Sequence, residues 1–303
     1  MTPNYVLFCF ACALAAAVAP WVVSEFWVFV FIEMVVFGLY AVTFNLLLGY
    51  GGMLAFGHAV FFGIGAYALA ILMKKAGLSA LPAAVLSPVV AGLAGAIIGY
   101  FCIRLSGIYL GMLTFAFQML VYTLVLKSYE FTGGDDGLSG LNSTGWAATP
   151  RGLYYVILIV VLTSLLLLWR LTRSPFGLAL AAQRGNARRA SALGMDVALH
   201  RWLTFVVASS FAGLAGALFA LANHNVFPGW LNWTASATPI VMTILGGMHS
   251  FIGPLVGSII YVLMQTYLTG FTEYWALFLG AAIILLVMLM PNGITGLLWE
   301  RRL

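Results

Sequence analysis

The sequence has little charge. Only 7% of its 303 residues are Asp, Glu, Lys or Arg, whereas 63% are hydrophobic. A soluble domain of this composition could not cover its surface with polar groups, so that class is excluded. Apolar runs of about twenty residues recur along the chain, which is the length that a helix needs to cross a bilayer. The sequence therefore predicts an all-α integral membrane protein with a single membrane domain, residues 1–303.

Motifs for catalysis are also missing, and the one redox-like spacing, Cys9-Phe10-Ala11-Cys12, lies in an apolar run that does not suit redox chemistry. The four histidines show no HExxH spacing, and neither a G-x-S-x-G elbow nor a Walker A sequence occurs. The three cysteines, Cys9, Cys12 and Cys102, lie in or beside apolar runs, where thiols behave as small apolar groups. We therefore expect no enzyme, no ATP hydrolysis by the chain alone, and no metal or cofactor bound to it.

The excess of basic residues does not indicate nucleic acid. The net charge is +5, but the Lys and Arg residues lie beside apolar runs, where they set membrane topology. We expect no nucleic-acid partner.

About ten transmembrane helices are predicted, arranged as a polytopic bundle. The segment 235–270 counts as two short helices because Gly246-Gly247 interrupts it. The predicted spans are residues 5–23, 26–48, 53–73, 83–101, 108–126, 153–169, 202–222, the two parts of 235–270, and 275–298.

A weak internal repeat indicates two related halves with discontinuous helices. Gly51-Gly52-Met53, followed after two residues by Phe56, matches Gly246-Gly247-Met248, followed after two residues by Phe251. Small residues at helical spacing predict close helix packing. They are Ala59, Gly63, Ala66 and Ala70, then Gly92, Gly95 and Gly99, then Ser209, Gly213, Gly216 and Ala220.

Four strongly polar residues fall within the predicted spans of the first half: Glu33, Asn45, His58 and Gln118. An unpaired polar group facing lipid is costly, so they should face the bundle or a cavity. For Glu33 the alternative is a protonated or paired carboxyl that holds helices together, whereas for His58 a structural hydrogen-bonding role is favoured over that of a proton carrier. The candidate pathway or hinge residues are Glu33, Asn45, Gly51, Gly52, His58, Gln118, Gly246 and Gly247.

Residues 170–201 form the one long polar segment, with six of the thirteen basic residues and a single acid, Asp196. Ser174-Pro175 is typical of a helix start and Gly194 of a helix end, so two short helices are predicted before a further start at Asp196. A basic loop of this kind is expected on the cytoplasmic side. The alternative is an arginine-rich loop that only fixes topology.

A second polar loop, 127–152, is predicted on the opposite side. The ten-span arrangement places nine basic residues inside (Arg104, the six of the loop, Arg301 and Arg302) and the other four of the thirteen outside. The acids and glycines of the loop 127–152 do not have the spacing of an EF-hand calcium site. The central residues are Thr132, Gly133, Gly134, Asp135, Asp136 and Gly137.

Three stretches resemble the M-type permease subunits of branched-chain amino acid ABC importers. They are the run from Asn45 through Gly51-Gly52-Met53 to Ala59, the run from Arg104 to Tyr109, and Ser174-Pro175-Phe176-Gly177 with the segment from Arg184 to Gly194. The resemblance extends from about Asn45 to Gly296. One departure is Ala187, which stands where the family usually has an acid.

The resemblance implies half of a transmembrane heterodimer in a bacterial inner membrane. A sister permease, two cytoplasmic ATPase subunits that hydrolyse ATP, and a periplasmic binding protein would complete an importer of branched-chain or related amino acids. The segment 132–137 would face the binding protein. The residues that would couple to the ATPase are Arg184, Asn186, Arg188, Arg189, Ala190, Ala192 and Gly194. The alternative is an ion-coupled secondary transporter, since intramembrane acids and broken helices occur there too.

Overall fold

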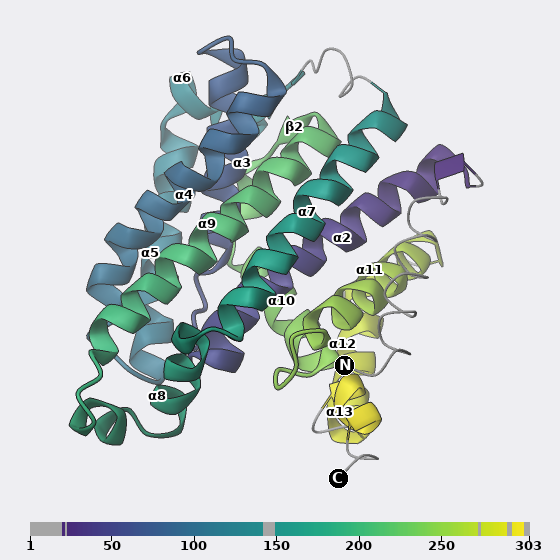
Figure 1. Ribbon diagram of the computed structural model, residues 1–303. Helices are drawn as coiled ribbons and strands as arrows, with labels where there is room; N and C mark the ends of the chain where they lie inside the picture. The colour runs from purple at the N-terminus through teal and green to yellow at the C-terminus, as the bar shows by residue number, and fades with distance from the viewer. Residues whose placement is uncertain (1–19, 22, 142–148, 272–273, 290–292, 300–303) are drawn as a thin grey trace.

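The computed structural model describes residues 20–21, 23–141, 149–271, 274–289 and 293–299, and within them it is a bundle of helices (Figure 1). The longer helices are α2 (Glu25–Asn45), α3 (Ala59–Lys74), α4 (Ala80–Cys102), α5 (Ile108–Lys127), α7 (Pro150–Thr172), α8 (Pro175–Ala192), α9 (Val197–Asn223), α10 (Trp233–Gly246), α11 (Gly253–Phe271) and α12 (Trp275–Leu289). The shorter elements are η1 (Leu46–Tyr50), α6 (Tyr129–Thr132), η2 (Gly134–Asp136), β1 (Leu138–Ser139), β2 (Asn225–Val226), η4 (Pro228–Leu231) and α13 (Gly293–Trp299).

The all-α, multi-pass membrane fold is confirmed. Within the described ranges, six helical segments are long and apolar enough to span a bilayer: α2 with η1, α4, α5, α7, α9 and α11. α3 and residues 276–285 of α12 are apolar but shorter. The predicted span 5–23 lies almost entirely outside the described residues, so the count of ten stays a prediction.

Two predicted boundaries were wrong. The span expected at 53–73 becomes helical only at Ala59, because Gly52 adopts a positive φ of 65° and the next residues form no regular helix. The span expected at 275–298 is divided into α12 and α13, and α13 begins at Gly293, whose φ is also positive at 73°.

The centre of the bundle is formed by α3, α4 and α9, whose backbones approach closely. A β-carbon on Gly65 would collide with the backbone of Gly213, and one on Gly216 with the carbonyl oxygen of Phe62. A β-carbon on Gly95 would collide with the Ser209 hydroxyl. The packing faces predicted for α4 and α9 are confirmed, because small residues let the backbones meet.

The packing face predicted for α3 was partly wrong. Ala59, Ala66 and Ala70 are buried, but a β-carbon on Gly63 would collide with the side chain of Leu231 in η4, not with α9. Gly65, two residues further on, is the glycine that meets α9.

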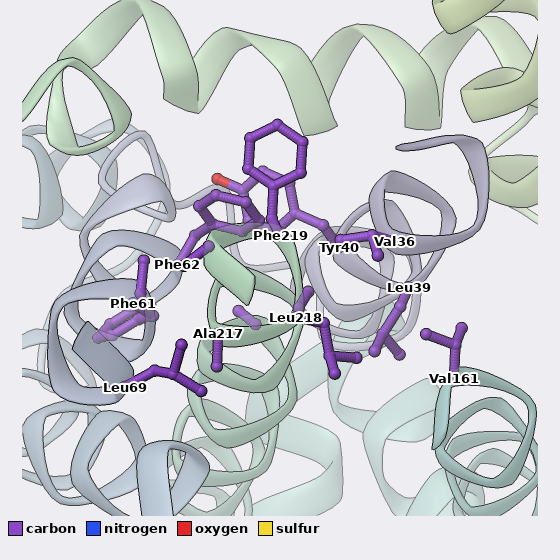
Figure 2. Packing of buried hydrophobic residues seen from close by; sticks show 14 of the residues in the cluster. Val36, Leu39, Tyr40, Phe61, Phe62, Leu69, Val161, Ala217, Leu218 and Phe219 are labelled. Atoms are coloured by element: carbon purple, nitrogen blue, oxygen red, sulfur yellow. The ribbon is translucent and has the colours of Figure 1, made fainter. Parts of the chain in front are cut away.

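Aromatic side chains fill the space between α2, α3 and α9. In Figure 2, Tyr40, Phe62 and Phe219 point toward one another from these three helices. Ring centroids lie 4.7 Å apart for Tyr40 and Phe62, and 5.8 Å apart for Phe62 and Phe219. Val161 brings α7 against the far side of α2, next to Leu39 (Figure 2). This cluster fixes α2, and hence its C-terminal break, relative to the centre of the bundle.

We expect Gly216→Ala to destabilise the protein, because its new methyl group would overlap the Phe62 carbonyl oxygen and push α3 from α9. Overpacking of this kind costs about 1–3 kcal/mol. The matched control is Gly280→Ala in α12, where an added β-carbon meets nothing within 4 Å. Thermal unfolding in detergent measures both variants, and equal midpoints would contradict the close packing.

Candidate functional site

The basic loop folds as predicted, into two short helices. Helix α8 runs from Pro175 to Ala192, but Asn186 interrupts it with φ −159° and ψ 101°. The Asn186 side chain accepts a hydrogen bond from the Arg189 amide at 3.0 Å and so caps the second helix. Gly194, with φ 87°, ends it, and the Asp196 carboxylate accepts from the Leu199 amide at 2.9 Å to start α9.

The second short helix and its end project away from the bundle. Asn186, Arg188, Arg189, Ala192 and Gly194 are exposed, as a docking surface requires, whereas Ala190 is only 4% exposed and packs inward. Leu193, which lies within the segment from Arg184 to Gly194 that the sequence singles out, is 88% exposed.

Arg184 is exposed, like its neighbours in the loop, and it also contacts the membrane domain. Its guanidinium donates a hydrogen bond to the carbonyl oxygen of Gly49, at the end of α2 and η1. Its aliphatic part lies against Gly52, where an added β-carbon would be 3.0 Å from Arg184 Cγ. The loop helix is therefore attached to the first helix break through this side chain.

Both predicted helix breaks are present, and they lie against each other. The first follows η1 at Gly51-Gly52, and the second separates α10 from α11 at Gly247, whose φ is 111°. A β-carbon on Gly49 would lie 2.5 Å from the Met248 carbonyl oxygen. Asn45 Nδ2 donates to the Ser250 carbonyl oxygen at 3.1 Å. The two halves of the repeat thus meet at their discontinuities.

The polar residues predicted for the pathway do not gather at one place. Glu33 lies twelve residues before Asn45 in α2, about 18 Å along the helix axis, and is partly exposed. His58 is fully buried, with Nε2 3.0 Å from Thr43 Oγ1 and its ring stacked on Tyr40. These contacts agree with the structural hydrogen-bonding role that the sequence favours for His58.

Gln118 fixes the connector that enters the bundle before α10. Its Nε2 donates to the Leu231 carbonyl oxygen at 2.9 Å, and its Oε1 accepts from Ser236 Oγ at 3.1 Å. Ser236 Oγ in turn accepts from the Ala59 amide at 3.0 Å, at the start of α3. The inward orientation predicted for Gln118 is confirmed, and the amide joins the starts of α3 and α10.

The segment 132–137 forms a compact turn at the opposite end of the bundle from α8 (Figure 1). Thr132 Oγ1 donates to the Ser128 carbonyl oxygen at 2.8 Å, and Gly133, Gly134 and Gly137 all have positive φ. Beyond the turn, β1 pairs with β2 in antiparallel register, Leu138 opposite Val226. Asp135 and Asp136 are exposed. The sequence did not predict the strands, which are two residues long.

Residues 26–288 match the family model described as the branched-chain amino acid transport system, permease component. The chain belongs to this family. The permease is 29% identical to the high-affinity branched-chain amino acid transport system permease protein LivM of Salmonella typhimurium, over 95% of its own length and 74% of that protein. The LivM of Escherichia coli K12 gives the same figures.

A second group of relatives carries a different name. The permease is 26% identical to the protein LivH of Salmonella typhimurium, over 86% of its own length and 91% of the relative. No solved structure matches the chain. The match to LivM is higher in identity and covers more of the chain, so this permease is of the LivM type.

We expect the two polar ends to label from opposite sides of the membrane. In a background in which Cys9, Cys12 and Cys102 are replaced, Ser139→Cys should react with an impermeant maleimide in intact cells, because Ser139 is exposed and lies beside the turn 132–137, which is predicted on the outside. Leu193→Cys, as the matched exposed position beside Gly194, should react only after lysis. Labelling of Leu193→Cys in intact cells would show the topology to be inverted.

Proposed function

We propose that this permease is one of two membrane subunits of an ATP-binding cassette importer for branched-chain or related amino acids in a bacterial inner membrane. The observation that carries the proposal is the loop 175–194: an exposed, basic, two-helix segment that is attached through Arg184 to a break in a membrane helix. A loop that only fixed topology would need its charges but not this attachment.

The proposed partner in the membrane is a sister permease. The relatives carry two names, LivM and LivH, for permease proteins of a branched-chain amino acid transport system, and the present chain is similar to both. A heterodimer of a LivM-type and a LivH-type subunit would place the translocation pathway between the two chains.

Two cytoplasmic ATPase subunits would supply the energy. They would contact the exposed surface formed by Asn186, Arg188, Arg189, Ala192 and Gly194, together with the projecting Leu193. The positive charges and the apolar side chain suit a groove with acidic walls and an apolar floor. ATP-driven closure of the ATPases would displace this surface, and the two permeases would open alternately to each side.

A periplasmic binding protein would deliver the substrate at the opposite end. There the turn 132–137 presents Asp135 and Asp136 to solvent. The side chain of Lys75, at the end of α3, donates to the Glu130 carbonyl oxygen of α6 at 2.5 Å and so holds the helix that leads into the turn. The same Lys75 lies over the Phe131 ring, 4.2 Å from its centroid. A rigid acidic turn is a suitable docking point for a soluble protein.

The rival function, ion-coupled secondary transport, depends on Glu33. We expect Glu33→Gln, which keeps the shape and hydrogen-bonding capacity of the side chain, to import radiolabelled leucine within about twofold of the wild-type rate. The measurement uses the complete importer in proteoliposomes, with ATP supplied and the proton gradient collapsed by an ionophore.

Vesicles without ATP are the control and should import nothing. Loss of uptake in Glu33→Gln, or a requirement for the proton gradient, would favour the secondary transporter.

A further inference from the structure

One side chain of the loop reaches into the membrane domain. Arg184 donates to the Gly49 carbonyl oxygen and packs along Gly52, so it contacts both sides of the first break. A hydrogen bond from a charged donor is stronger than a neutral one. Arg184 is thus positioned to couple any displacement of α8 to the backbone between α2 and α3.

The first break is in contact with the second. Gly49 lies against the Met248 carbonyl, and the Asn45 side chain holds the carbonyl of Ser250. Gly49 has no room for a side chain, because an added β-carbon would also collide with the Asn45 amide. A shift at Gly49 must therefore displace the segment 247–250.

The second break is in turn held by α13, near the C-terminus. Thr295 Oγ1 donates to the Gly246 carbonyl oxygen at 2.7 Å and lies 3.0 Å from Ser250 Oγ. Gly293 packs directly on Gly247, where no β-carbon would fit. Segments from four parts of the chain, 45–53, 184, 246–250 and 293–295, thus form one continuous cluster, which we call the break cluster.

Polar atoms of the cluster and of its attachment lack partners in this conformation. Gln183, next to Arg184, is 2% exposed, and neither its amide nitrogen nor its amide oxygen has a hydrogen-bond partner; the Asn45 Oδ1 atom is also buried and unpaired. An unpaired buried polar group is costly, and a rearrangement that pairs it is favoured. Such atoms are expected at an element that has a second arrangement.

We propose that Arg184 is a positioning residue that latches the cytoplasmic loop to the break cluster, so that displacement of α8 moves both helix breaks and α13 together. The proposal rests on the proposed function, because it assumes that ATPase subunits move α8. It assigns to Arg184 a role inside the permease, distinct from the surface of Arg188 and Arg189 that would contact the ATPase.

The first test replaces the latch in the complete reconstituted importer. We expect Arg184→Ala to lower the leucine imported per ATP hydrolysed by at least about tenfold, the lower end of the range for losing one hydrogen bond from a charged donor. The amount of ATPase that co-purifies with the permease should stay unchanged. Arg184→Lys, which keeps a charged donor, should recover part of the coupling. Arg104→Ala is the control, since Arg104 is exposed just after the end of α4 and, among the hydrogen bonds of the described chain, donates only to Tyr100 of that helix.

The second test covers the case in which Arg184→Ala does not fold. Gly52 and Gly77 both have a φ of 65°, so alanine adds the same backbone strain at each. At Gly52 the new β-carbon would press on Arg184 Cγ, whereas at Gly77 it would meet nothing within 4 Å. We expect only Gly52→Ala to lower the coupling ratio.

The outcomes separate the two proposals. Wild-type coupling in Arg184→Ala, or equal effects of Gly52→Ala and Gly77→Ala, would overturn the latch. Failure of the wild-type permease to bind any ATPase or to import leucine with ATP would overturn the proposed function itself. A fall in co-purified ATPase for Arg184→Ala, without a change in import per ATP, would show that Arg184 serves only the docking surface.

Discussion

A break in a membrane helix exposes backbone groups that hydrocarbon cannot satisfy, and the arrangement of this permease follows from that constraint. At the first break the π-helical turn η1 pairs some of them internally, with the Met53 amide 2.8 Å from the Leu47 carbonyl oxygen. The Gly49 carbonyl takes its partner from Arg184, far along the sequence. At the second break Thr295 and Asn45 bond the carbonyls of Gly246 and Ser250.

These partners come from distant parts of the chain, so the breaks cannot be positioned independently. The same holds at the start of α3 and α10, where Gln118 and Ser236 connect three helices through one chain of hydrogen bonds. Close packing of α3, α4 and α9 then supplies a rigid centre, because their glycines bring backbone against backbone. The permease therefore combines a tightly packed centre with buried polar junctions at the helix breaks and helix starts, and the junctions are where a second arrangement can form.

The sequence predicted the elements better than their contacts. The repeated Gly-Gly-Met turns located both helix breaks, and Pro175, Gly194 and Asp196 located the ends of the loop helices. These signals are local, since proline and glycine act on their own backbone. The start of α3 was misplaced because residues 53–58 are apolar whether or not they are helical.

The tertiary contacts between these elements could be identified only from the structure. Small residues on one helical face predict that this face packs closely. They do not predict which element it packs against, as Gly63 and Gly65 show. An arginine in a basic loop is expected to face water. Nothing in the sequence indicates that the side chain of Arg184 also reaches the Gly49 carbonyl oxygen. The two-residue strands β1 and β2 carry no periodicity at all. The predicted site residues were thus mostly found on the correct element, while their partners were not predictable.

The most direct test of the joined breaks is hydrogen–deuterium exchange of the permease with and without bound ATPase. If Arg184 ties α8 to the break cluster, binding at the loop should change exchange of the amides at 246–253 as well as at 49–58, and Arg184→Ala should abolish both changes. The amides of α4 and α9 at the bundle centre should stay the same. A change confined to 186–194, identical in the wild type and in Arg184→Ala, would contradict the connection between the cytoplasmic loop and the helix breaks.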